Sequence, residues 1–392
     1  MCGRFCLTFA TRSLAVLVSW LVFSKTKNEF SLGLLGISEA IPFLITAIFA
    51  GVTADNFSRK KIIVLCSIGY LLCCLALLLI YINLDFFYAN FGVLPIYFII
   101  FITGIVRGFY APSHGAFAAQ LVPKELYIYS SVWNSLSFGL SVVIGPAVGG
   151  LVYGFFGMLP ALLIVIAFAS ISILFFLSIK PRPVNKINNA EGIFDKIKQG
   201  LKFVFKTQEL VGAFALDMFA VLFGGAIALL PAFADKILDC GPQGLGFLQA
   251  APAIGAISTS FFLVGNPVKK RAGLKMLFSI AMFGICIIGF ALSTNYILSF
   301  VCLMFSGVFD EVSVVVRSTI VQLYAPEEMR GRVESVSKIF IGSSNEIGAF
   351  ESGTAARFMG LVPSVVFGAT ITLLVVGIAY KKLPKIKDLE FS

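Results

Sequence analysis

Ionisable side chains lie inside segments of this 392-residue chain that are long and apolar enough to cross a bilayer. They are Arg12, Arg107, Asp217, Asp310, Glu311, Arg317, Glu346 and Glu351. A charge that faces lipid costs about 3 kcal/mol or more, so it persists where it faces water or an opposite charge. These charges therefore predict a hydrated pathway through the membrane.

The spacing of the charges indicates which of them share a helix face. Asp310 and Arg317 are seven residues apart, which places them on one face of a helix. Glu346 and Glu351 are five apart and point in different directions, and we expect Glu346 to face the pathway. Proton coupling needs an acidic group whose protonation changes with its access to water. The alternative is a static network of ion pairs that only holds the helices together.

The composition assigns the chain to a membrane. Of its residues, 58% are hydrophobic and 13% are charged, whereas soluble domains carry roughly 25% charged residues. The apolar stretches are continuous, while the strands of a membrane barrel alternate over short segments. We therefore predict an all-α polytopic membrane protein. The net charge of +10 comes from basic residues that flank the apolar stretches, which favours an orienting role over nucleic-acid binding.

A membrane-spanning helix needs about 20 apolar residues, and the sequence contains twelve candidates. Their limits are 2–24, 31–53, 62–83, 92–119, 130–154, 158–179, 209–233, 243–265, 273–293, 295–323, 333–357 and 360–380. With both termini cytoplasmic, the inner loops and the tail hold most lysines and arginines, as the positive-inside rule requires. No cleavable signal peptide is evident, and because the first span begins almost at Met1 we expect a natural start slightly upstream.

One long polar break, 180–208, divides the chain into an N-terminal bundle, 1–179, and a C-terminal bundle, 209–392, with six spans each. Within the break, residues 194–206 have an amphipathic pattern, with Leu201 and Val204 on one side and lysines opposite. We expect this linker helix to lie on the inner membrane surface.

The two halves share short strings at one constant spacing. The matched residues are Pro123 with Pro326, Glu125 with Glu328, Ile144 with Ile347, Gly145 with Gly348 and Gly150 with Gly353. Matches in two separate strings at the same spacing indicate an internal duplication. Two pseudo-symmetric six-helix bundles with a site near the midplane are typical of secondary transporters.

Residues for other kinds of chemistry are scarce. His114 is the single histidine, and none of the eight cysteines forms a ligand-spaced pair, so we predict no metal site and no cofactor. His114 is expected to be a structural hydrogen-bonding group rather than a proton relay. No phosphate-binding loop is present, which excludes direct use of ATP by this chain. A membrane enzyme such as an acyltransferase would need a histidine–acid pair or a metal cluster, so we predict no enzymatic activity.

The loop after the second span carries the string GVTADNFSRKK at residues 51–61. Asp55 and Arg59 are four residues apart and can pair on one helical turn, while Gly51 permits close helix packing. The string resembles the loop between spans two and three in the major facilitator superfamily, with Lys60 at its basic end. The resemblance implies that Asp55, with Arg59, braces the facing end of span eleven and stabilises the outward-facing state.

The fifth span contains a glycine–proline cluster formed by Gly145, Pro146, Gly149 and Gly150. Pro146 removes a backbone donor and bends the helix, and the glycines let a neighbouring helix pack closely. The cluster resembles the superfamily's antiporter motif, which is typical of proton-driven exporters and therefore favours export over uptake.

In the superfamily, spans one, four, seven and ten line the central cavity. The resemblance implies that the charges facing it are Arg12, Arg107, Asp217, Asp310, Glu311 and Arg317. Arg107 is similar to the span-four arginine that is linked to proton transfer. At the spacing that relates the halves, Arg107 corresponds to Asp310, and Arg12 corresponds to Asp217 within two residues. Cations of one half would then oppose anions of the other, which lowers the cost of desolvating each.

Strings at 215–234, 314–336 and 340–353 resemble a bacterial branch of the superfamily near the enterobactin-exporter-like and drug-efflux permeases. The resemblance implies an inner-membrane carrier that works by alternating access and exports a small siderophore- or drug-like molecule in exchange for protons. We expect a monomer. Three alternatives stay open, namely a proton-independent facilitator, a carrier of lipids or zwitterions, and a membrane sensor that transports nothing.

Overall fold

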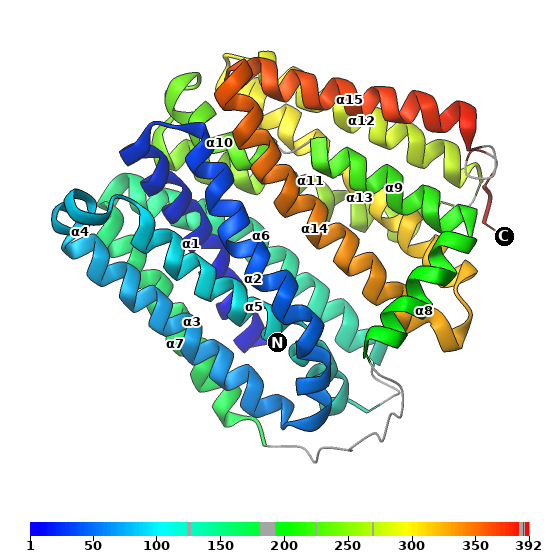
Figure 1. Cartoon of the computed structure of the whole chain (residues 1–392), viewed down its shortest axis with the longest axis horizontal. Coiled ribbons are helices and arrows are strands. Elements are labelled where there is room, and N and C mark those ends of the chain that lie inside the picture. The colour runs from blue at the N-terminus through cyan, green and yellow to red at the C-terminus, as the bar shows by residue number, and fades with distance from the viewer. Residues whose placement is uncertain are drawn as a thin grey trace. The chain divides into compact units, whose positions relative to one another are not determined.

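The computed structural model of the chain describes residues 1–123, 127–180, 193–223, 226–268, 270–383, 387 and 389–391. Within these ranges the surroundings of some helical residues lie outside the description. Gly51, Asp55 and Glu346 are among these residues. The described residues form helices and include no strand, which confirms the all-α prediction (Figure 1).

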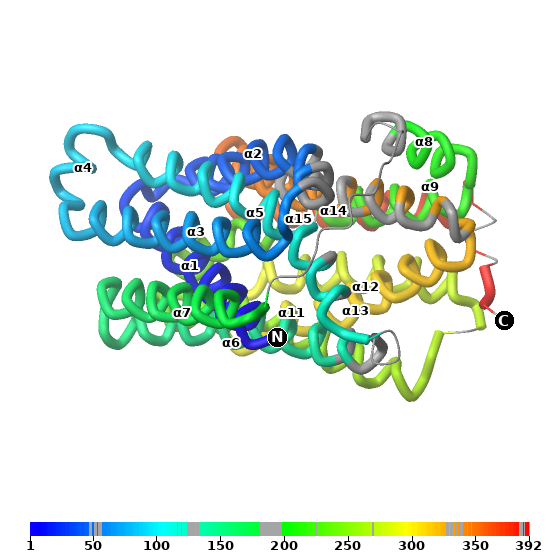
Figure 2. The backbone as a smooth tube through the Cα atoms, turned by 90° about the horizontal axis from the view of Figure 1, so that it is seen from below, coloured from blue at the N-terminus to red at the C-terminus, as the bar shows by residue number. Residues whose placement is uncertain are grey.

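The first half of the chain contains α1 (Cys2–Thr26), α2 (Glu29–Asn56), α3 (Arg59–Ile82), α4 (Leu84–Phe91), α5 (Leu94–Leu121), α6 (Tyr127–Phe156) and α7 (Met158–Ser178). The second half contains α8 (Ile193–Lys206), α9 (Gln208–Phe223), α10 (Ala226–Lys236), α11 (Gly241–Gly265), α12 (Ala272–Leu292), α13 (Tyr296–Tyr324), α14 (Glu327–Met359) and α15 (Leu361–Lys382). The short helix α4, between the third and fourth spans, was not predicted and lies where α3 turns into α5 (Figure 2).

Among the described residues, eleven segments are long and apolar enough to cross a membrane. One of them, Gln208–Lys236, takes in both α9 and α10. The expected span at 333–357 lies within α14, which has 33 residues but carries more charge than the other spans. Adding α14 gives the twelve predicted spans. Helices suit this setting because each span satisfies its own backbone hydrogen bonds where no water is present.

Two glycines mark equivalent tight turns in the two halves. Gly157 precedes α7 with φ 87°, and Gly360 precedes α15 with φ 89°. Only glycine adopts such backbone angles without strain. The two glycines stand at the same spacing as the matched strings, so the duplication extends to the turns between spans.

Packing divides the chain into two compact units. Unit 1 comprises Met1–Lys27, Leu34–Ala190 and Cys240–Ala250, and unit 2 comprises Asn28–Gly33, Glu191–Asp239 and Ala251–Ser392. The predicted bundles, 1–179 and 209–392, differ from these units in two places. The first residues of α2 belong to unit 2, and the first turns of α11 belong to unit 1.

Equivalent glycines explain both exchanged segments. A Cβ added at Gly150 of α6 would lie 2.5 Å from the carbonyl oxygen of Pro242, at the start of α11. A Cβ added at Gly353 of α14 would lie 2.8 Å from the Cα of Gly33, near the start of α2. Because Gly150 and Gly353 are matched positions, each half uses the same glycine to hold the beginning of one span against its neighbour.

The linker helix α8 belongs to unit 2 and packs on its core. Val204 is 2% exposed within the core of unit 2, and Leu201 packs beside it. Gly200 brings α8 close to α14, because a Cβ there would lie 2.9 Å from the carbonyl oxygen of Arg332. Arg332 also donates a hydrogen bond to Gln199. Val204 and Leu201 are therefore covered by α14 and α9, next to which α8 appears in Figure 1, whereas Phe205 on the same helix is 66% exposed. The expected place of α8 at the inner membrane surface stays a prediction.

Candidate functional site

Arg107 of α5 forms an ion pair inside unit 1. Its Nη1 lies 3.0 Å from Oε1 of Glu39 on α2, and its guanidinium lies 4.7 Å from the ring centre of Phe43. The side chain of Arg107 is 45% exposed and that of Glu39 is 34% exposed. This pair is therefore partly exposed at the surface of unit 1 rather than sealed in its core.

Two glycines make the Arg107–Glu39 pair possible. A Cβ at Gly104 would collide with the carbonyl oxygen of Glu39, and a Cβ at Gly108 would collide with the side chain of Thr46. The backbones of α2 and α5 therefore touch on both sides of Arg107. The sequence did not predict Glu39 as the partner of Arg107. Two glycines four residues apart beside an intramembrane arginine are nevertheless a detectable sign of a close helix contact.

The glycine–proline cluster of α6 is a packing surface for α1 and α11. The Cβ of Arg12 would lie 3.0 Å from a Cβ added at Gly145, and Ser13 donates a 2.7 Å hydrogen bond to the carbonyl oxygen of Gly145. Gly149 packs on Ser13, and the carbonyl oxygen of Pro146 would lie 2.6 Å from a Cβ added to the facing glycine of α11. Arg12 itself is exposed.

The matched glycine in the second half makes the equivalent contact. A Cβ at Gly348 of α14 would lie 2.7 Å from the carbonyl oxygen of Leu222 on α9. Gly145 packs span five on span one, and Gly348 packs span eleven on span seven. Corresponding spans therefore meet through corresponding residues, which supports the duplication at the level of helix packing.

Lys60, in the loop after span two, caps the end of α7. Its ammonium donates a 2.8 Å hydrogen bond to the carbonyl oxygen of Leu177 and a second one to that of Ile179. These carbonyls end α7, where a cation compensates for the unpaired acceptors and the helix dipole. Arg59 begins α3, and the side chains of Asp55 and Gly51 are outside the described set.

Unit 2 contains a buried ion pair between α9 and α13. A guanidinium nitrogen of Arg317 contacts Oδ1 of Asp217, and the two side chains are 6% and 7% exposed. The sequence analysis placed Asp310 and Arg317 on one face of α13 and opposed Arg12 to Asp217. The structure joins Asp217 to Arg317 within unit 2, and the opposition of Arg12 to Asp217 stays a prediction.

The neighbouring carboxyls of α13 have different surroundings. Ser260 of α11 donates a 2.6 Å hydrogen bond to Oε1 of Glu311. Asp310 is half-buried in the middle of α13 and makes no hydrogen bond or ion pair with any residue that the structure describes. Of these two groups, Asp310 is the one whose protonation no described partner fixes.

The ends of α10 and α14 hold the first turn of α2 through contacts that the sequence did not predict. Lys236 of α10 contacts Glu29 at 2.5 Å, and the guanidinium of Arg357 lies 5.2 Å from the ring centre of Phe30. Among the described residues, Glu351 of α14 receives a long 3.5 Å hydrogen bond from Ser352 and no other. The side chain of Glu346 lies outside the description, so its expected place facing the pathway stays a prediction.

The remaining candidate group, His114, lies in an aromatic and polar cluster of unit 1. It is buried and stacks on Tyr110 with ring centres 5.4 Å apart. The hydroxyls of Tyr110 and Ser113 are buried without a hydrogen-bond partner among the described residues. The part of the chain that the structure describes contains no group of three or more side chains suited to a metal ion.

Twelve spans in two duplicated halves, with ion pairs inside each half, define a multi-pass membrane protein with the architecture of a secondary transporter. The chain belongs to the family described as transmembrane secretion effector, MFS_3, which matches residues 8–391. It is a transporter of the major facilitator type and not an enzyme.

Known proteins similar to this chain agree with that assignment. The enterobactin exporter EntS of Escherichia coli O1:K1 / APEC is 28% identical over 386 residues, which cover 96% of this chain and 88% of the exporter. A bacterial homolog of the human lysosomal transporter Spinster has a TM-score of 0.75 at 12% identity and covers 98% of this chain and 96% of its own. A D-xylose–proton symporter has a TM-score of 0.72 at 14% identity, with 100% and 98% covered. The two solved structures support the fold alone.

Proposed function

We propose that this protein is a proton-coupled exporter of a small organic molecule of the siderophore or drug-like class. Membership of a secretion-effector family and the resemblance to an enterobactin exporter favour outward transport of such a solute. The distribution of lysines and arginines supports an orientation in the inner membrane with both termini in the cytoplasm. We expect the carrier to act as a monomer.

The observation that carries the proposal is the position of Asp310. This carboxyl lies within a membrane span and has no hydrogen bond or ion pair to a described residue, whereas Asp217 is held by Arg317. A carboxyl without a fixed partner can change its protonation as the halves alternate between the two sides of the membrane. Proton uptake at Asp310 would neutralise a charge of the pathway and help release the solute. Glu346 is the second candidate for this role.

The mechanism is alternating access, in which the two halves rock about a central site. Asp55 and Arg59, by their resemblance to the superfamily loop, would stabilise one state. The glycine–proline cluster of α6 would permit small shifts between α6 and its neighbours, because its contacts are made by backbone and small side chains.

The proposal is tested by flux in proteoliposomes with an imposed pH gradient, using enterobactin and ethidium as two separate probes. The wild-type protein is expected to move one probe against its gradient and to stop when an ionophore collapses the pH difference. The substitution Asp310→Asn should remove the pH dependence, whereas Glu390→Gln in the C-terminal tail should keep it. Unchanged pH dependence in both Asp310→Asn and Glu346→Gln would refute proton coupling through these carboxyls. Flux that persists after the gradient is collapsed would identify a facilitator.

A further inference from the structure

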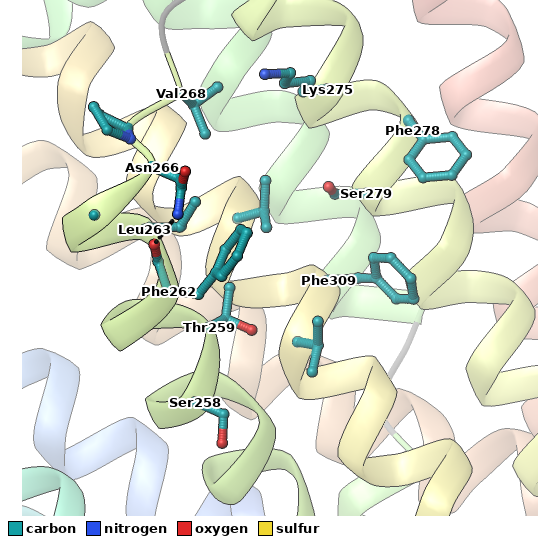
Figure 3. Close-up of a pocket in the computed structure, with 14 residues that line it drawn as sticks. Ser258, Thr259, Phe262, Leu263, Asn266, Val268, Lys275, Phe278, Ser279 and Phe309 are labelled. Carbon is teal, nitrogen blue, oxygen red and sulfur yellow. Dashed lines mark hydrogen bonds between the residues drawn. The ribbon is translucent and has the colours of Figure 1, made fainter.

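A cavity of about 900 Å³ lies within unit 2 between α11, α12 and α13. Figure 3 shows Phe262 and Leu263 on one side and Phe278 and Phe309 on the other, with Lys275 at one end. Its volume is in the range of sites that hold drug-sized ligands. Neither Asp310 nor Glu311 lines it, so the cavity is distinct from the candidate coupling site.

The cavity follows from the way α11 and α13 cross. They touch where a Cβ added at Gly307 would lie 2.7 Å from the Cα of Pro252, and where one at Gly255 would lie 2.9 Å from the backbone nitrogen of Val308. Helices that cross at an angle diverge beyond their contact. Past this crossing, α11 presents the small residues Ser258 and Thr259, which do not fill the space that opens.

The wall formed by α12 belongs to a surface suited to lipid. Phe278, Ile285 and Leu292 are seven residues apart, so they share one face of α12, and they are 60%, 49% and 64% exposed. A continuous apolar face of this kind on a membrane span contacts hydrocarbon. Phe262, on the opposite wall, is 65% exposed. The cavity is therefore bordered on both sides by residues of a lipid-facing surface.

One end of the cavity is basic. Lys275 lines it, and Lys270 and Arg271 precede it in the exposed connection between α11 and α12. The start of α12 has no side-chain cap, but the amide of Gly273 donates to the carbonyl oxygen of Leu389 in the C-terminal tail, so the attraction for an anion comes from the basic side chains. Glu390 is the described acidic group that contacts this end, where its carboxylate accepts a 3.3 Å hydrogen bond from the backbone N–H of Arg271. Among the described residues, Lys270, Arg271 and Lys275 thus outnumber this one carboxylate at the mouth.

We propose that this groove binds an anionic phospholipid of the inner leaflet. The phosphate would contact Lys275, and an acyl chain would lie between Phe262, Phe278 and Phe309. The positions along α12 match a phospholipid. At 1.5 Å per residue, Lys275 lies about 5 Å from the helix start, at the level of the headgroup, and Phe278 lies about 5 Å deeper, at the level of the acyl chain. Basic pockets between spans on the cytoplasmic side are suited to anionic headgroups. The proposal does not depend on which solute the protein exports.

The test compares retention of two lipids by the purified full-length protein in detergent, measured by native mass spectrometry. The lipids are dioleoyl phosphatidylglycerol and dioleoyl phosphatidylcholine. The wild-type protein should retain the anionic lipid more strongly. A single lysine near a headgroup contributes about fivefold in affinity, so Lys275→Gln should lower the preference by about that factor. Lys382→Gln, a matched exposed lysine at the end of α15, should leave it unchanged.

A second variant tests the apolar part of the groove. Ser258→Trp places a large ring in the cavity from an exposed position, and it should lower retention of both lipids at unchanged thermal stability. Equal retention of the two lipids by the wild type, or an unchanged preference in Lys275→Gln, would overturn the proposal. Loss of the bound lipid on adding inorganic phosphate would also overturn it, because it would show an anion site without an acyl-chain groove.

Discussion

The buried ion pair between Asp217 and Arg317 should dominate the stability of unit 2. Their side chains are 7% and 6% exposed, so neither charge has access to water if its partner is removed. Removing one partner of a buried pair costs about 3–5 kcal/mol, because it leaves an uncompensated buried charge. We predict that Arg317→Met destabilises the protein by this amount.

The exposed pair in unit 1 provides a matched comparison. Arg107 and Glu39 are also one guanidinium and one carboxylate on neighbouring spans, but they are 45% and 34% exposed. Exposed pairs contribute about 1 kcal/mol or less, so Glu39→Gln should cost no more than that. For a unit of this size, these free energies correspond to shifts in Tm on the order of 10 °C for Arg317→Met and about 2–4 °C for Glu39→Gln.

Thermal unfolding in a single detergent is the assay, with the double variant Asp217→Leu/Arg317→Met as the decisive sample. Replacing both charges by apolar groups of similar size is close to neutral for a buried pair, so the double variant should recover most of the stability lost in Arg317→Met. If the double variant is less stable than Arg317→Met, or if Arg317→Met and Glu39→Gln shift Tm equally, the reasoning from burial is wrong.

Two further predictions concern the glycines and the loop lysine. Gly150→Val and Gly353→Val should each destabilise the protein by about 1–3 kcal/mol through overpacking. Gly377→Val should change Tm little, because nothing lies within 4 Å of a Cβ added there. Similar Tm shifts in all three variants would contradict the close helix contacts at Gly150 and Gly353. Lys60→Met should cost about 2 kcal/mol through the lost bonds to the end of α7, while the exposed Lys61→Met should stay within about 0.5 kcal/mol. Both are measured as Tm, and equal values for the two lysine variants would refute the capping role.

Hydropathy predicted the spans because the bilayer sets their length and apolar character. The repeats predicted that the spans fall into two similar halves. A span must be long and apolar to cross the membrane, so the span limits follow from composition. The expected span at 333–357 was also long enough, although α14 is more polar than the other spans. The duplication was visible because the positions that cannot carry a side chain are glycine in both halves. Gly150 and Gly353 illustrate this, since each packs against backbone of a neighbouring span.

The partners of the charges could not be predicted in the same way. Spacing along one helix shows which residues share a face, but it does not show which residue of another helix faces them. The spacing of Asp310 and Arg317 shows that they share a face of α13, but it could not show that Arg317 pairs with Asp217 on α9. The linker helix shows a related ambiguity, because an apolar side chain such as Val204 is equally suited to lipid and to packing against α14.

The ion pairs separate structural charges from those available for coupling. Arg107 is compensated by Glu39 and Arg317 by Asp217, whereas Asp310 has no such partner among the described residues. Arg317→Met should therefore lower Tm strongly and, in the folded fraction, keep the pH dependence of flux. Asp310→Asn should do the reverse, with little change in Tm and a lost pH dependence. If Asp310→Asn lowered Tm as much as Arg317→Met and retained the pH profile, Asp310 would belong to the static network instead.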